Sequence, residues 1–382
     1  MRNFICVGLG IVLAYFGNVS AQTQTLKALA TSRGIHFGAA VTSNARSAEY
    51  NRVLSTEFNT MVAENAMKFG LVEATRNQFT WTTSDALVDF AQQNGMAMRG
   101  HNFCWHQQSG FAQTINVPRD TMLAILKNHI NVVAGRYKGK IYEWDVVNEG
   151  VNDNGLSLRA SNWQVRIGND YIDSAFVFAH RADPNALLVY NDYSAEAMNT
   201  KSNYIYTMVQ GLKTRGIPIN GVGLQCHFNL GGFDTASIGA NMKRIETLGL
   251  GISITELDIT TSGSTANLDA QKAAYKSMMA LCLRHPGCKT FITWGVNDAQ
   301  SWRGAGAVPL LFTGTTTITP KPAYTGVQEA LLAAAPVTGI LVVRHGSLAA
   351  VSQPGRSAFD LSGRKVSGFT KPATLTFSPL VR

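Results

Sequence analysis

The feature of the sequence that most constrains the fold is a repeated alternation of short apolar runs and longer amphipathic stretches. Eight runs rich in β-forming residues follow one another at 36–41, 59–66, 96–105, 140–149, 186–193, 221–228, 251–259 and 289–296. Helical patterns lie between several of them, at 85–95, 121–137, 172–182, 202–216 and 271–285. Eight strands that alternate with helices over about 300 residues predict an α/β fold, the (β/α)8 TIM barrel.

A doubly wound open sheet is the alternative fold for such an alternation. That fold commonly carries a glycine-rich GxGxxG turn after its first strand, where it binds a phosphate. Here the first run is followed by TSNARSAEY at 42–50, which contains no glycine. The sequence therefore favours the closed barrel.

The N-terminal residues follow the plan of a secretory signal peptide. Arg2 supplies a positive charge, Ile5 to Phe16 an apolar segment, and Val19-Ser20-Ala21 a small-residue cleavage site. The apolar segment is shorter than the about 20 residues that a membrane-spanning helix needs. We therefore predict a signal peptide at 1–21, export of the mature chain, and no membrane span. A catalytic domain is predicted at 22–334.

The last part of the chain, 335–382, has a different pattern, with short alternating apolar runs between Gly, Pro and Ser residues. It predicts a small β module or a loosely ordered extension. The stretch AFDLSGRKV at 358–366 is similar to C-terminal segments that some bacteria append to secreted or surface-bound proteins. Surface attachment or sorting through this tail is one interpretation, and a disordered basic linker is the other.

The charge of the chain argues against a nucleic-acid partner. The formal net charge is +9, with 15% charged and 45% hydrophobic residues, which is enough apolar material for a large core. The tail carries six Lys or Arg against one Asp, more than half of the positive excess. Dense basic runs interleaved with aromatic residues, which nucleic-acid binding favours, are absent from the sequence. We expect a monomer.

Polar residues gather where seven of the eight strands would end. In a barrel the functional residues lie at the C-terminal ends of the strands, on one rim. The candidate rim residues, in chain order, are Glu64, Asn65, Lys68, His101, Trp105, His106, Gln108, Asn148, Glu149, Asn191, Asp192, Tyr193, Gln225, His227, Glu256, Asp258, Trp294, Asn297 and Asp298.

Two carboxylates on this rim suggest a reaction. Glu149 ends the fourth strand, and Glu256 lies in SITELDI on the seventh, between apolar neighbours. Glycoside hydrolysis needs such a pair, one acid to protonate the leaving oxygen and one carboxylate to attack or to activate water. Taken alone, Glu149 could be a solvated loop residue and Glu256 part of a buried ion pair. Together on facing strands they indicate a catalytic pair.

Six motifs carry a family resemblance over residues 30 to 332. AENAMKF, RGHNFCWH, WDVVNE, GLQCHF, TELDI and TWGVNDAQSWRG occur in this order, and the chain resembles the glycoside hydrolase family 10 xylanases. The resemblance implies a retaining endo-β-1,4-xylanase that acts on xylan and xylo-oligosaccharides without a cofactor. It implies that Glu149 is the general acid/base and Glu256 the nucleophile.

The resemblance also assigns supporting and binding roles. Asn148 would bond the sugar 2-hydroxyl, His227 would bond the nucleophile, Asp258 would orient that histidine, and Gln225 would lie near the acid/base. Trp294 would form a platform under the cleavage site, and Trp302 would cover it. The remaining substrate-binding residues would be Glu64, Asn65, Lys68, His101, Trp105, Gln108 and Tyr193.

Four cysteines remain after the signal peptide. Cys282 and Cys288 flank a Pro-Gly turn that can bring their thiols together, and an exported protein can hold such a short-loop disulfide. A similar pair is common in the resembled family. Cys104 and Cys226 lie in apolar strands and are expected as buried free thiols. His101 and His106 would lie on opposite faces of a strand, so no metal site is expected.

Departures from the family pattern and alternative functions stay open at this point. Gly150 stands where many relatives have a larger residue, and we expect it to loosen the leaving-group side. Asp145 could lie on the face of Glu149 or at its edge, and Trp81 and Trp144 are expected in the core.

A β-glucan hydrolase on the same barrel and a catalytically inactive glycan-binding protein are the alternative functions. Trp302 hints at xylose if it blocks a C6 hydroxymethyl group.

Overall fold

The computed structural model describes residues 24–42, 46–304 and 306–335, and in the tail 358–359 and 365–366. The predicted signal peptide at 1–21 and most of the predicted tail lie outside these residues. Contacts divide the chain into two units, residues 1–337 and 338–382. In the second unit, β12 (Ala358–Phe359) pairs antiparallel with β13 (Lys365–Val366). The predicted domain boundary after residue 334 stays a prediction.

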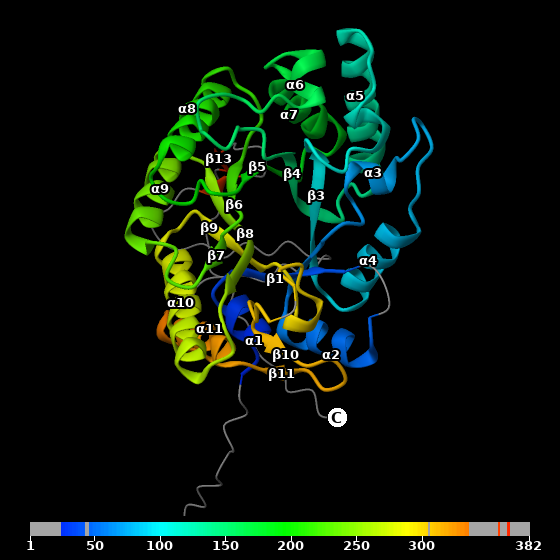
Figure 1. Cartoon of the computed structure of the whole chain (residues 1–382). Coiled ribbons are helices and arrows are strands. Elements are labelled where there is room, and N and C mark those ends of the chain that lie inside the picture. The colour runs from blue at the N-terminus through cyan, green and yellow to red at the C-terminus, as the bar shows by residue number, and fades with distance from the viewer. Residues whose placement is uncertain (1–23, 43–45, 305, 336–357, 360–364, 367–382) are drawn as a thin grey trace, which may run out of the picture. The chain divides into compact units, whose positions relative to one another are not determined.

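The first unit is a closed barrel of eight parallel strands, which confirms the predicted fold (Figure 1). Neighbouring strands pair in chain order, β6 pairs with β8, and β9 pairs with β1 to close the barrel. The barrel strands are β1 (His36–Val41), β2 (Thr60–Ala63), β3 (Ala97–Cys104), β4 (Ile141–Asn148), β5 (Leu187–Asp192), β6 (Gly221–Leu224), β8 (Gly251–Thr260) and β9 (Cys288–Thr293).

Helices surround the strands (Figure 1). Five were predicted from their pattern and are present as α4 (Thr82–Gln93), α5 (Arg119–Arg136), α7 (Tyr171–Ala182), α8 (Thr200–Thr214) and α10 (Thr265–Arg284). The others are α1 (Leu26–Ser32), α2 (Ala48–Glu57), α3 (Phe69–Val72), α6 (Asn162–Ile167), α9 (Thr235–Thr247) and α11 (Pro322–Ala333). Among the described residues, no helix combines the length and the apolar character needed to cross a membrane.

The helices predicted from the sequence did not include α2, which begins at Ala48, several residues after β1 ends at Val41. Ser47 caps this helix, since its hydroxyl accepts the N–H of Tyr50. Asp234 caps α9 in the same way through the N–H of Ala236. In both helices the cap, more than the apolar spacing, marks the start.

The predicted sixth strand, 221–228, is wrong in one respect, because it is broken in the middle. β6 ends at Leu224, and the chain resumes as β7 (His227–Asn229), which pairs with β8. Between them Cys226 has φ of +63°, in the left-handed region that residues other than glycine seldom adopt. A continuous strand is incompatible with that backbone conformation.

The barrel interior holds a buried ion-pair network beneath the rim. Arg99 is fully buried and bonds Glu143 at 2.5 Å and Asp145 at 2.6 Å. Asp145 also bonds Nδ1 of His101 at 2.8 Å. This places Asp145 under His101, inside the barrel, and answers the question that the sequence left open. Trp144 is fully buried, as expected.

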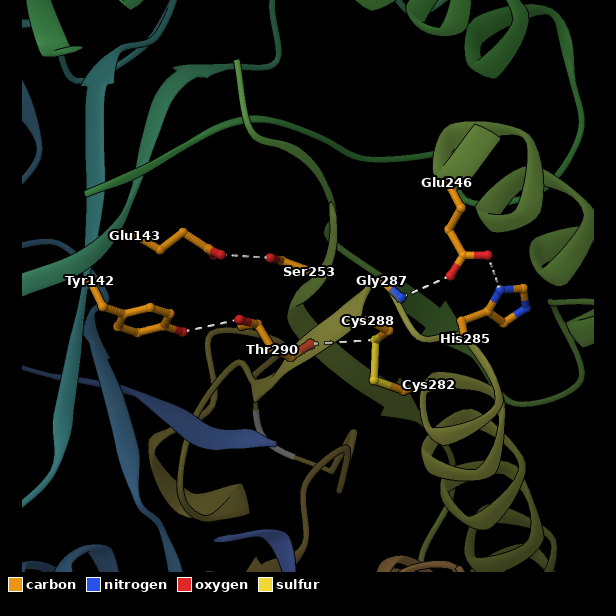
Figure 2. The surroundings of a disulfide bond; sticks show 9 residues. All are labelled: Tyr142, Glu143, Glu246, Ser253, Cys282, His285, Gly287, Cys288 and Thr290. Carbon is orange, nitrogen blue, oxygen red and sulfur yellow. Dashed lines mark hydrogen bonds and ion pairs between the residues drawn. A yellow bond between two sulfur atoms is a disulfide. The ribbon is translucent and has the colours of Figure 1, made fainter. Parts of the chain in front are cut away.

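Trp81 packs half-buried against the core. The predicted disulfide is present between Cys282 and Cys288 (Figure 2). In Figure 2 the disulfide joins the end of α10 to the start of β9, and the carboxylate of Glu246 faces Gly287 and His285 of the turn between the two cysteines. That carboxylate accepts the N–H of Gly287 at 2.9 Å and bonds Nδ1 of His285 at 3.1 Å. The turn between the two cysteines is thus fixed by hydrogen bonds as well as by the covalent link.

Candidate active site

A cleft of about 570 Å³ opens at the C-terminal ends of the barrel strands. It brings together every predicted catalytic and substrate-binding residue, and the predicted supporting residues except Asp258, which lies buried beneath it. The lining residues are Glu64, Asn65, Lys68, His101, Trp105, Gln107, Gln108, Asn148, Glu149, Tyr193, Ser194, Gln225, His227, Glu256, Trp294, Trp302 and Arg303. Gln107, Ser194 and Arg303 were not predicted.

Glu149 directly follows β4 and has φ of +55°, which turns the chain out of the strand at the rim. Its carboxylate accepts two hydrogen bonds, from Nε1 of Trp105 at 2.7 Å and from Nε2 of Gln225 at 3.1 Å. Nδ1 of His106 lies 3.6 Å away. Burial, followed by the charge of Arg159, lowers the pKa of His106 to about 4. The two groups that donate to the Glu149 carboxylate, Trp105 and Gln225, are uncharged, whereas the guanidinium of Arg159 donates to the backbone carbonyl of Glu149 at 3.0 Å.

Glu256 lies within β8 and is 4% exposed. One carboxylate oxygen accepts Nδ2 of Asn191 at 2.8 Å, and the other lies 3.2 Å from Nε2 of His227. Nδ1 of the same imidazole bonds Asp258 at 2.9 Å. Burial opposes the charge of this imidazole, but its bonds to Asp258 and Glu256 outweigh burial and raise the pKa of His227 to about 9. A protonated His227 can donate to both carboxylates at neutral pH.

Asn191 is a site residue that the sequence placed on the rim but gave no role. Its amide nitrogen donates to Oδ1 of Asn148 at 2.8 Å as well as to Glu256. Its own amide oxygen accepts the hydroxyl of Thr255 at 2.7 Å. Asn191 therefore fixes the orientation of Asn148 relative to Glu256. Its position at the end of β5 was the sequence feature that could have identified it as a site residue.

One side of the cleft is built around a buried lysine. Nζ of Lys68 donates to Asn65 and to Gln108, each at 2.9 Å, and lies 4.8 Å from the ring centre of Trp105. Burial lowers the pKa of Lys68 and raises that of the neighbouring Glu64. This cluster offers both donors and acceptors to the hydroxyl groups of a bound sugar.

The loop after β9 contributes two residues that converge on Asp258. Trp302 is 52% exposed, and its Nε1 donates to Oδ2 of Asp258 at 2.7 Å. Nε of Arg303 donates to Oδ1 at 2.8 Å. Trp294, 6% exposed, stands edge-on to the rings of His101 and His227. Sequence motifs could not reveal the link from Arg303 to Asp258, because it joins the loop after β9 to the separate strand β8.

The expectation that Gly150 loosens the leaving-group side is wrong. A Cβ atom at this position would lie 2.9 Å from the hydroxyl of Tyr171 and 3.3 Å from the ring of Tyr190. Both tyrosines are buried, so a side chain would point into the protein and not into the cleft. Gly150 is required by close packing of the chain behind the rim.

Two further sequence expectations concern histidines and thiols. His106 lies beyond the end of β3 at Cys104, so it is not on the opposite face of a strand from His101 as predicted. Donor atoms of His101, Asp145 and Glu256 lie within 4.8 Å of one another, close enough to share a metal ion. Each already has hydrogen-bond partners within the protein, and we assign no metal to them. Cys104 and Cys226 are buried free thiols, as expected.

Comparisons with known proteins agree with this geometry. The sequence model described as glycosyl hydrolase family 10 matches residues 25–330. Endo-1,4-beta-xylanase B of Thermotoga neapolitana is 35% identical over 337 residues, covering 84% of this chain and 96% of that protein. Exoglucanase XynX of Acetivibrio thermocellus is 38% identical over 297 residues, or 73% of this chain but 27% of that protein.

A solved structure gives the same result in three dimensions. Xylanase 10B from Thermotoga petrophila RKU-1, in complex with xylobiose, superposes with a TM-score of 0.78 at 36% identity. The match covers 81% of this chain and 98% of that one. The chain is a glycoside hydrolase and belongs to glycosyl hydrolase family 10.

Proposed function

We propose that this enzyme is an endo-β-1,4-xylanase that cleaves internal xylosidic bonds of xylan with retention of configuration, with Glu149 as general acid/base and Glu256 as nucleophile. The observation that carries the assignment of roles is the contrast between the two carboxylates. Glu256 is bonded by a cationic His227, whereas Glu149 is bonded by the neutral donors Trp105 and Gln225. A nucleophile must be ionised, and a general acid must be able to hold a proton.

The reaction then proceeds in two displacements. In the first, Glu149 gives its proton to the glycosidic oxygen as the carboxylate of Glu256 attacks the anomeric carbon. The bond to the leaving sugar breaks, and a covalent glycosyl-enzyme forms. In the second, Glu149 takes a proton from water, which attacks the anomeric carbon and releases Glu256. Asn148, held by Asn191, would bond the 2-hydroxyl of the reacting sugar.

One property of the cleft and one comparison support a xylan substrate. Trp105, Trp294 and Trp302 provide apolar ring faces beside the polar cluster of Lys68 and Glu64, a combination suited to stacking on sugar rings while bonding their hydroxyls. The xylanase of Thermotoga neapolitana matches this chain over 96% of its own length. We further propose export through the signal peptide at 1–21, a monomeric enzyme, and attachment or sorting through residues 335–382.

A β-glucan hydrolase is the second candidate, because one relative is named an exoglucanase. Trp302 is half-exposed and lines the cleft, and we infer that it would obstruct a C6 hydroxymethyl group, which favours xylose. Wild type, Glu149→Ala and Glu256→Ala should be assayed on xylan, mixed-linkage β-glucan and carboxymethylcellulose. We expect xylan hydrolysis by the wild type alone. Higher kcat/KM on β-glucan would contradict the substrate, and a wild type inactive on all three would favour a glycan-binding protein.

A further inference from the structure

The break between β6 and β7 connects the two candidate catalytic carboxylates. Gln225 precedes the break residue and donates to Glu149 at 3.1 Å. His227 follows it and bonds Glu256 at 3.2 Å. Only Cys226 separates them, and its left-handed backbone, with φ of +63°, directs the two neighbouring side chains to different carboxylates.

At the break the N–H of Cys226 takes a side-chain partner, whereas the neighbouring backbone groups keep backbone partners. The N–H of Gln225 still bonds the carbonyl of Asp192 at 3.1 Å, and the carbonyl of Cys226 accepts the N–H of Asp258 at 3.3 Å. The N–H of Cys226 instead donates to Oε1 of Glu196, at 2.9 Å. A buried N–H requires a partner, so the break depends on that carboxylate.

Glu196 is itself held in place by the fold. It lies in the loop after β5 and is 5% exposed. Nδ2 of Asn241, from α9, donates to the carbonyls of Ala195 and Glu196, each at 2.9 Å. The Glu196 side chain reaches Cys226 without contributing to the lining of the cleft. It therefore has no direct access to a bound sugar.

We infer that Glu196 is a positioning residue for both catalytic carboxylates. By accepting the N–H of Cys226 it holds the chain in its left-handed conformation, and thereby keeps Gln225 within reach of Glu149 and His227 within reach of Glu256. This role rests on the proposed function of the two carboxylates. It requires an acceptor oxygen at one place and does not require the negative charge of Glu196.

Substitutions can separate the acceptor from the charge. Glu196→Gln keeps an acceptor oxygen at the same distance from the backbone, and its kcat should stay within about 3-fold of wild type. Glu196→Leu removes the acceptor and should lower kcat about 100-fold with little change in KM. Both limbs of the pH profile of kcat/KM should move to higher pH in the Leu variant, because each carboxylate loses a donor that favours its ionised form. Where the Leu variant does not fold, Glu196→Asp, which keeps the charge but shortens the side chain, should lower kcat about 10-fold.

Glu73 offers a matched control. It is 1% exposed, and its Oε1 accepts the N–H of Asn77 at 2.8 Å, a residue that also has φ of +63°. Glu73→Leu, which also leaves buried His129 without its carboxylate partner, should lower the Tm at least as much as Glu196→Leu and leave the pH profile unchanged. A Leu variant of Glu196 with wild-type kcat and pH profile would overturn the inference. So would a Gln variant as impaired as the Leu variant, because charge would then be what matters.

Hydrogen exchange tests the same inference without activity. Exchange of the peptide that contains Cys226 should be slow in wild type and Glu196→Gln and faster in Glu196→Leu. Equal exchange in all three proteins would contradict the positioning role. A wild type that does not cleave xylan would contradict the proposed function alone, since the exchange result stands independently of it.

Discussion

Glu149 and Glu256 lie in one cleft, yet they are held in opposite ways. Glu256 is fixed within a strand and bonded by an imidazole that carries a proton near neutral pH. Glu149 lies just past a strand end and is bonded by an indole and an amide, both neutral. Under the proposed mechanism the charge of the donors would assign the two roles, since the carboxyl groups themselves are chemically identical.

The largest expected effects come from removing either carboxylate, and the losses for the two variants should differ with the leaving group of the substrate. Glu256→Ala should lower kcat at least about 10⁴-fold on xylan and on an aryl β-xylobioside alike, because every substrate needs the nucleophile. Glu149→Ala should be similarly impaired on xylan but should still form the glycosyl-enzyme from the aryl substrate, whose leaving group needs no proton. Burst kinetics of phenol release would measure this. Identical losses of kcat for both variants on both substrates would contradict the different roles of Glu149 and Glu256.

Removal of the cation beside Glu256 should have the next largest effect. His227→Asn should lower kcat/KM about 100-fold and move the acidic limb of its pH profile to higher pH, because the nucleophile loses a charged donor. His285→Asn, which removes an imidazole bonded to a carboxylate far from the cleft, is the control and should leave the profile unchanged. An unshifted acidic limb in His227→Asn would show that the cation does not set the role of Glu256.

The same histidine should make stability depend on pH. Because folding raises the pKa of His227 to about 9, its contribution is complete below its unfolded pKa of about 6.5 and is lost as pH rises through 9. The free energy of unfolding should fall by roughly 1 to 3 kcal/mol more in wild type than in His227→Asn over this window. Urea denaturation at pH 6 and 9.5 measures the difference. Parallel curves for the two proteins would contradict a charged His227.

The smallest expected effect concerns the backbone behind Glu149. Gly150→Ala should lower the free energy of unfolding by about 1 to 2 kcal/mol, because the new methyl group meets Tyr171, while kcat should stay within about 3-fold. Gly135→Ala in α5, where a Cβ meets nothing within 4 Å, is the control and should be neutral or stabilising. A changed product pattern in Gly150→Ala without loss of stability would restore the idea that Gly150 shapes the leaving-group side.

The sequence allowed prediction of what depends on periodicity and position. Alternating apolar runs predicted the barrel, and polar residues at strand ends predicted most of the side chains that meet in the cleft. The predicted rim residues that do not line it are His106, Asn191, Asp192, Asp258, Asn297 and Asp298. What it could not reveal depends on contacts between distant segments. The left-handed turn at Cys226 carries no composition signal, because cysteine is not a residue typical of that conformation. The bonds from Asn191 and Glu196 likewise join residues of different strands and loops.

The most direct test of the different roles of Glu149 and Glu256 is to trap the covalent intermediate. The enzyme is incubated with a 2-deoxy-2-fluoro-β-xylobioside that has an activated leaving group. This compound slows both displacements but slows the second, which releases the sugar, more than the first, so the glycosyl-enzyme accumulates. Peptide mass spectrometry then locates the attached sugar. We expect stoichiometric labelling on Glu256, abolished in Glu256→Ala. Labelling on Glu149, or hydrolysis that proceeds with inversion and without any attached sugar, would contradict it.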